Sequence, residues 1–122
     1  MKDLFWLAGL LEGEGSFGLF TRRDKEEEYK VPYLVLGMSD KDVVEKAAVL
    51  MNYMAGTKIK VWRRQRNPTY KQMWNFTMKG SGAMRIAHAV YPTMGKRRRE
   101  QIDRMGIAFA ELPGSGRKRK SI

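Results

Sequence analysis

Apolar residues along this chain change from a helical spacing to a two-residue alternation and back, and these changes divide the sequence into elements. From Asp3 to Gly13 the apolar positions recur every three or four residues, which predicts a helix. From Ser16 to Arg23, and again from Val31 to Met38, they alternate with other residues, which predicts two strands. The charged segment 24–28 lies between the strands, so we expect a hairpin that turns there.

Helical spacing returns three times further along the chain. It covers residues 39–56, 80–92 and 96–109. Ser39 with Asp42 three residues later is similar to a helix start, and Gly56 is expected to end that helix. The last helix is expected to bury three apolar residues, Ile102, Met105 and Ile107.

A second hairpin is predicted between these helices. Alternation covers residues 58–64 and 73–78, with a turn at Asn67-Pro68. The order is therefore αββαββα with a short extra helix, an α+β fold. The two hairpins can join into one antiparallel, saddle-shaped sheet with helices on one face and the polar face free. Residues 1–110 are expected to form a single domain, and the Gly-rich, basic residues 111–122 a flexible tail.

The charge of the chain changes the picture from fold to partner. Its 24 Lys and Arg against 13 Asp and Glu give a net charge of +11, which predicts a polyanionic partner. Between Thr57 and Lys79 there are seven basic residues and no acidic one, interleaved with aromatic residues. This pattern favours a nucleic-acid surface, and a twisted sheet can lie in a DNA major groove. A generically basic structural protein is the alternative, and it predicts binding without sequence preference.

Composition also restricts the chemistry and the location. The chain has no Cys and a single His, His88, which excludes disulfides and thiolate zinc sites, so a metal must be held by oxygen. We expect His88 to be packed on an apolar helix. The chain has no apolar run of roughly 20 residues and begins without a signal-peptide pattern, so we expect a soluble, intracellular protein with no membrane partner.

Two carboxylates near the end of the first predicted helix are unexpected in a basic protein. Glu12 and Glu14 flank Gly13, and they would repel a phosphate unless they bound a divalent cation such as Mg²⁺. The alternative is that they are solvated or cap the structure. Gly9 and Gly13, four residues apart, would let another backbone approach closely, unless the helix simply ends at Gly13.

Residues 7–15, LAGLLEGEG, followed by Ser16-Phe17, resemble the signature of the LAGLIDADG homing endonucleases. Five positions match, namely Leu7, Ala8, Gly9, Leu10 and Gly15, and Glu replaces Asp at both acidic positions. The order of elements also resembles that family over about residues 1–110. Glu keeps the carboxylate and lengthens its reach, a departure that bears on metal geometry.

The resemblance implies roles for individual residues. Glu14 corresponds to the catalytic carboxylate that binds Mg²⁺, for which Mn²⁺ can substitute, and the carbonyl of Gly13 faces the same metal. Glu12 is then structural. Asp40 falls where the family has a polar residue that contacts the water network, although charge matching at a helix start is an equal alternative.

The resemblance also assigns the basic run that opens the last helix. Lys96 or Arg97 falls where the family carries a cation near the scissile phosphate. Arg98 and Arg99 are expected to form a solvated or phosphate-contacting face.

The chain has one such motif, which implies that two chains are needed to cut two strands. The predicted dimer interface comprises Leu7, Ala8, Gly9, Glu12 and Gly13. Outward strand positions are the predicted DNA contacts: Arg22, Tyr33, Lys58, Lys60, Arg64, Arg66, Lys71 and Asn75.

The function implied is a site-specific double-stranded DNA endonuclease of the intron-homing kind. A homodimer would hydrolyse a pseudo-palindromic site and leave short 3′ overhangs. The alternative is a non-cleaving DNA- or RNA-binding protein on the same scaffold, such as a maturase or a regulator. Loss of the metal carboxylate would mark that alternative, and the presence of Glu14 favours the nuclease.

Overall fold

The computed structural model describes residues 2–64 and 71–112. The elements are α1 (Lys2–Glu14), β1 (Gly15–Asp24), β2 (Glu27–Met38), α2 (Lys41–Ala55), β3 (Trp62–Arg64), β4 (Met73–Lys79), α3 (Gly80–Val90), the short 3-10 helix η1 (Tyr91–Thr93) and α4 (Lys96–Ala110). The predicted order αββαββα, with one short extra helix, is confirmed. The turn predicted at Asn67-Pro68 lies outside the described residues, as do residues 113–122 of the predicted tail.

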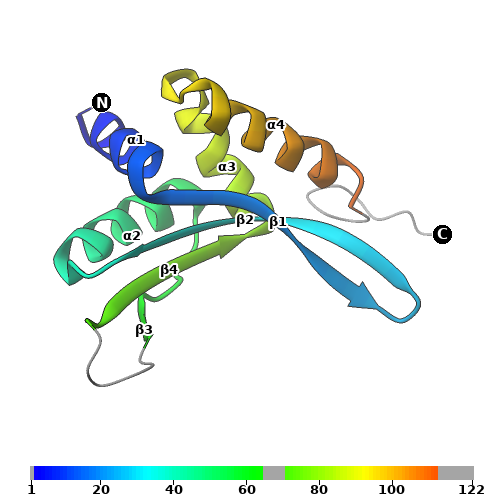
Figure 1. The fold of residues 1–122 in the computed structure, drawn as a ribbon, viewed down its shortest axis with the longest axis horizontal. Helices are drawn as coiled ribbons and strands as arrows, with labels where there is room; N and C mark the ends of the chain where they lie inside the picture. The colour runs from blue at the N-terminus through cyan, green and yellow to red at the C-terminus, as the bar shows by residue number, and fades with distance from the viewer. Residues whose placement is uncertain (1, 65–70, 113–122) are drawn as a thin grey trace.

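The two hairpins join into one four-stranded antiparallel sheet in the order β1-β2-β4-β3. The hairpins meet where β2 pairs with β4, with Leu36 opposite Phe76. In Figure 1 the helices lie on one side of this sheet, and the β1–β2 hairpin continues beyond them as a curved ribbon. The other face of the sheet is free of helices, as the α+β prediction requires.

The core lies between the sheet and the helices. Strand residues such as Phe17, Leu36 and Phe76 are at most 5% exposed. They face helix residues such as Leu11 and Met51, which are fully buried. Burying each large apolar side chain contributes about 1.5–3 kcal/mol. This packing holds α1 firmly, so the end of α1 is a rigid place for a functional group.

The β1–β2 hairpin is longer than predicted. Pairing continues to Asp24 opposite Glu27, and only Lys25 and Glu26 form the turn. Polar pairs extend the strands: Arg23 bridges Glu28, and the Lys30 ammonium donates to the Thr21 hydroxyl over 2.7 Å. Most of the charged segment 24–28 therefore belongs to the strands, because polar cross-strand pairs, like apolar ones, stabilise strand pairing.

Other element ends differ in detail. Residues 57–61 are not in a strand, and β3 has three residues. Asp40, not Ser39, occupies the N-cap of α2, while Gly56 ends α2 with φ of 70°, as predicted. Ile107 is 65% exposed, so the prediction that it points inward is wrong, whereas Ile102 and Met105 are buried. Among the described residues, no helix is long and apolar enough to cross a membrane.

Candidate functional site

The carboxylate of Glu14 is presented by an abrupt junction between helix and strand. Glu14 is the last residue of α1, and β1 begins at Gly15 with no loop between them. Gly15 is buried, and a Cβ there would lie 2.9 Å from the Leu11 carbonyl oxygen, so this tight junction requires glycine. Gly13 and Glu14 are both exposed. The junction thus fixes the backbone while leaving a carboxylate and a carbonyl at the surface.

Glu12 links α1 to the beginning of α4. Its Oε1 accepts a hydrogen bond of 2.9 Å from the backbone N–H of Gly95, the N-cap residue of α4. Its backbone carbonyl accepts a 3.2 Å hydrogen bond from Nε of Arg98. Glu12 therefore joins two helix ends within the chain, and this contact gives the residue a structural role.

The first turn of α4 brings two exposed cations to this junction. Lys96 and Arg97 follow Gly95 directly, so the Glu12 link holds them beside the last turn of α1. Lys96 also lies 3.9 Å from Glu100 as an exposed pair. The exposed carboxylate of Glu14 can bind a metal, and an exposed cation on the adjacent end of α4 can contact the phosphate that the metal binds.

Asp40 lies at the open end of the β1–β2 hairpin, where the α1–β1 junction also lies. Gly15 pairs with Leu36, and β2 ends two residues later, just before Asp40. Asp40 is exposed and its side chain makes no capping hydrogen bond to α2. Capping therefore does not occupy this carboxylate.

The oxygen donors at the junction suit a hard cation. Glu14 offers one carboxylate and Gly13 one carbonyl, and Mg²⁺ prefers one or two carboxylates together with water and phosphate oxygens. Within residues 2–64 and 71–112, no three acidic, His or Cys side chains cluster as an all-protein metal site would require. The residues fit a metal that completes its shell with water, phosphate or a second chain.

The exposed side of α1 differs from the predicted interface in two positions. Leu7 is 0% and Ala8 3% exposed, so both belong to the core of their own chain, and their place in a subunit interface stays a prediction. Gly9 and Gly13 are exposed, and no atom in the described part of the chain lies within 4 Å of an added Cβ. Phe5, four residues before Gly9, is 58% exposed and extends this surface.

The free face of the sheet carries aromatic and basic residues in rows. Tyr33 pairs with Gly18 and Lys79, and its hydroxyl lies 2.7 Å from where a Gly18 Cβ would be, so Gly18 makes room for the Tyr33 ring. The rings of Tyr33 and Phe20 are 6.4 Å apart, and the Lys79 ammonium lies 5.1 Å from the Phe20 ring. Sequence reasoning missed Lys79, although it continues the alternation of Asn75 and Thr77.

The predicted DNA contacts are spread over and around this face. Arg22 is exposed on β1, Tyr33 is half-buried on β2, and three lysines are exposed in segments flanking the short hairpin: Lys58, Lys60 and Lys71. Arg64 ends β3, and Arg66 lies outside the described residues.

Asn75 alternates with the core residues Phe76 and Met78, as predicted, but it is largely buried within its row of the sheet. It is 8% exposed, and its Nδ2 has no hydrogen-bond partner in the described part of the chain. It packs against Gly37, where an added Cβ would meet its Oδ1 at 2.4 Å. Its partner in β3, Trp62, is 46% exposed and is the more accessible side chain of this row.

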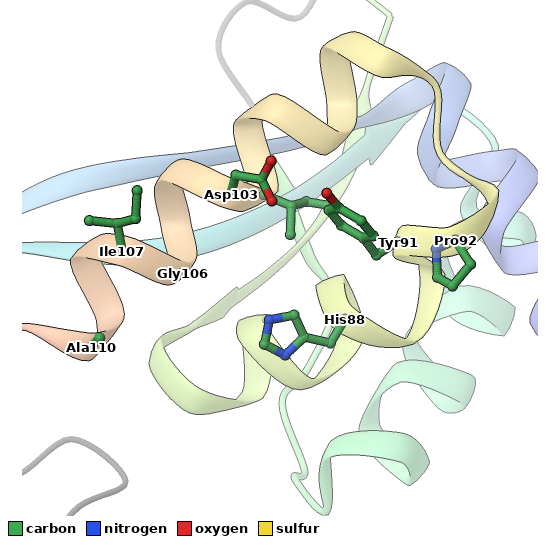
Figure 2. A pocket seen from close by; sticks show the side chains of 8 residues that line it. His88, Tyr91, Pro92, Asp103, Gly106, Ile107 and Ala110 are labelled. Atoms are coloured by element: carbon green, nitrogen blue, oxygen red, sulfur yellow. The ribbon is translucent and has the colours of Figure 1, made fainter.

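A groove on the helix side is separate from these groups. It has a volume of about 790 Å³ and lies between α3 and α4 (Figure 2). The Tyr91 hydroxyl points toward Asp103, and a hydrogen bond to this carboxylate raises the pKa of the Tyr91 phenol above its ordinary value. His88 lines the groove and is exposed, so the prediction that it is packed is wrong. The groove holds neither Glu14 nor the cations of α4.

Comparison with solved structures identifies the fold. The group I intron-encoded homing endonuclease I-CeuI, complexed with DNA, matches with a TM-score of 0.63 and 14% identity over 87% of this chain and 53% of its own. The archaeal intron-encoded homing endonuclease I-Vdi141I, also complexed with DNA, matches with a TM-score of 0.63 and 13% identity, over 88% of this chain and 67% of its own. The LAGLIDADG homing endonuclease I-GzeII, in complex with a DNA target, matches with a TM-score of 0.55 and 13% identity, over 85% of this chain and 36% of its own.

These likenesses show that the chain has the fold of DNA-binding homing endonucleases, so the predicted fold is confirmed. The chain spans about half the length of I-CeuI. Comparison with protein-family models and with curated proteins found no match.

Proposed function

We propose that this chain, which has the homing endonuclease fold, is a LAGLIDADG endonuclease that cuts double-stranded DNA at a specific site. The observation that carries the proposal is Glu14, exposed at the α1–β1 junction beside the cationic first turn of α4. The solved structures that share this fold include endonucleases in complex with DNA. I-CvuI was crystallised with the I-CreI target in 2 mM Mg, where the DNA was not cleaved, and with its own target in 2 mM Ca.

The residues at the junction suit hydrolysis of a phosphodiester. Glu14 and the Gly13 carbonyl would hold Mg²⁺, or Mn²⁺ in its place, which supplies activation of water and neutralisation of the leaving oxygen. Lys96 or Arg97 would contact the scissile phosphate and stabilise its developing charge. Asp40, at the same end of the hairpin, would orient a water molecule by accepting its hydrogen bond.

A second copy of the chain completes the proposal. Each chain supplies one Glu14, so a double-strand break needs two. The exposed stripe of Phe5, Gly9 and Gly13 leaves room for α1 of a second copy, because no atom of residues 2–64 and 71–112 lies within 4 Å of a Cβ added at either glycine. A twofold pair would read a pseudo-palindromic site, one half-site per chain, and leave short 3′ overhangs.

The free face of the sheet suits a DNA major groove. It is open, it carries Arg22, Tyr33 and Lys79, and the chain has a net charge of +11. Cations at the rim of such a face position the phosphate backbone, and strand residues two apart read base edges.

Selection of cleaved duplexes from a pseudo-palindromic library in Mg²⁺ tests the function. We expect the wild type to cut a defined subset, and Glu14→Gln to lose at least about 100-fold in cleavage rate while still binding the selected duplex. Glu45→Gln, an exposed carboxylate on α2, is the matched control and should cleave normally.

Specific binding by the wild type without cleavage in Mg²⁺ or Mn²⁺ would overturn the nuclease. It would favour the non-cleaving DNA- or RNA-binding alternative.

A further inference from the structure

Arg98 differs from its three neighbours in the basic run that opens α4. Lys96, Arg97 and Arg99 are exposed, whereas Arg98 is 8% exposed. A buried guanidinium requires hydrogen-bond partners, because removing a charge from water is costly. Arg98 makes its hydrogen bonds within the chain, so its cation serves the chain itself.

The partners of Arg98 are neutral groups. Its Nε donates to the Glu12 carbonyl over 3.2 Å, and its Nη1 donates to Oε1 of Gln101 over 3.2 Å. Its guanidinium carbon lies 5.9 Å from the centre of the Phe17 ring. These contacts hold the cation against the last turn of α1 and the first residues of β1.

The last turn of α1 needs such a cation. It carries Glu12 and Glu14 at the negative end of the helix dipole and has no basic residue of its own. The Glu12 carbonyl is also one of the last four of the helix, which have no partner within it. Arg98 satisfies this carbonyl and offsets the negative charge from a different element.

The contact is reciprocal. While Arg98 of α4 closes the C-terminal end of α1, the Glu12 carboxylate accepts the Gly95 N–H at the N-terminal end of α4. Two helix ends of opposite polarity are thus joined by two hydrogen bonds between residues more than 80 positions apart. The next residue along α1, Gly13, is exposed together with Glu14, and neither of the two hydrogen bonds described for Arg98 goes to it.

We propose that Arg98 is a positioning residue that fixes the last turn of α1 so that the Gly13 carbonyl and the Glu14 carboxylate converge on one cation. This inference rests on the proposed function. It separates the four basic residues into a buried one that shapes the metal site and exposed ones that face DNA.

The test compares Arg98→Gln with Arg104→Gln, which removes the same charge from an exposed position of the same helix. The readout is Mn²⁺ binding to the complex of protein and selected duplex, measured by electron paramagnetic resonance below both unfolding transitions. We expect Arg98→Gln to weaken Mn²⁺ binding by about 10-fold or more, and to raise the Mg²⁺ concentration needed for half-maximal cleavage, while duplex affinity in Ca²⁺ changes less than about threefold. Arg104→Gln should leave Mn²⁺ binding unchanged.

Arg98→Lys keeps the proposal testable if Arg98→Gln does not fold. Lysine retains the charge but loses the Nε hydrogen bond to the Glu12 carbonyl. The Mn²⁺ affinity of Arg98→Lys should therefore lie between those of wild type and Arg98→Gln. If only Arg98→Lys folds, its Mn²⁺ affinity should be lower than that of wild type. Wild-type Mn²⁺ affinity in the folded Arg98 variants overturns the positioning role and leaves the proposed function intact. A wild-type complex that neither binds Mn²⁺ nor cleaves overturns the proposed function, and the positioning role with it.

Discussion

Glycines of one short motif meet different requirements. Gly15 is buried, and an added Cβ would lie 2.9 Å from a backbone oxygen of Leu11. At Gly9 and Gly13, an added Cβ would have none of the atoms that the structure describes within 4 Å. Gly15 is therefore required by the fold of one chain, while the other two are required only if something approaches α1 from outside.

Gly15→Ala should destabilise the folded chain. Because the atom that the new methyl meets is backbone, neither side can move without shifting the α1–β1 junction, and overpacking of this kind costs about 1–3 kcal/mol. Urea unfolding at fixed protein concentration measures this. Gly106→Ala on α4 is the control, since its added Cβ would meet only Met84 at an ordinary 3.8 Å. An unfolding midpoint for Gly15→Ala equal to wild type would contradict the close approach.

Arg98 shows why the sequence did not reveal every site residue. Four consecutive basic residues are typical of a solvated face, and the partner that buries one of them, Glu12, is 86 positions away. The carboxylate of Glu14, in contrast, was predicted from its motif because local sequence determines the junction that presents it. The helix end that presents Glu14 could be predicted from local sequence, whereas the contact between Arg98 and Glu12 could not.

At the scale of elements, the period of the apolar residues predicted the order of helices and strands and the face that each buries. Leu34, Leu36 and Phe76 face the helices as the alternation requires. The predictions failed where the spacing of apolar residues does not determine the length or the orientation of an element. Polar pairs lengthened the β1–β2 hairpin, and Ile107 lies off the apolar stripe of α4 that contains the buried Ile102 and Met105.

Helix α1 has one face in the core and one that we expect to meet a second copy. Gly9→Leu tests this face. An added Cβ at Gly9 would meet no atom of the described residues within 4 Å, and leucine favours a helix over glycine by up to about 1 kcal/mol, so the folded monomer should be at least as stable as wild type. The dimer should dissociate, because the side chain occupies the space needed by the partner helix. Sedimentation and thermal unfolding measure the two effects.

Arg85→Leu, at an exposed position of α3, is the control for adding an apolar side chain to the surface. It should sediment as wild type does. A Gly9→Leu variant that sediments with the wild-type mass would show that α1 does not form the interface.

At the scale of the whole molecule, the proposal divides labour between two copies. Glu14 ends the helix that would pack on its partner, so a metal there could be shared and a change at Glu14 would affect both centres. Lys96 and Arg97 belong to α4, outside that helix pair, so each copy should apply them to one strand only. This difference makes the cations of α4 the better probe of symmetry.

Mixed dimers of wild type and the double variant Lys96→Gln, Arg97→Gln should therefore nick. If equal amounts of the two chains exchange freely, about half of the dimers are mixed, and these should convert a supercoiled plasmid with one site to the nicked circle and no further. The double variant alone should leave the plasmid supercoiled, and the wild type alone should linearise it. Gel electrophoresis separates the three forms. If the mixture gives only linear and supercoiled DNA, with no nicked product beyond that of wild type, one chain does not act on one strand, and the twofold arrangement is incorrect.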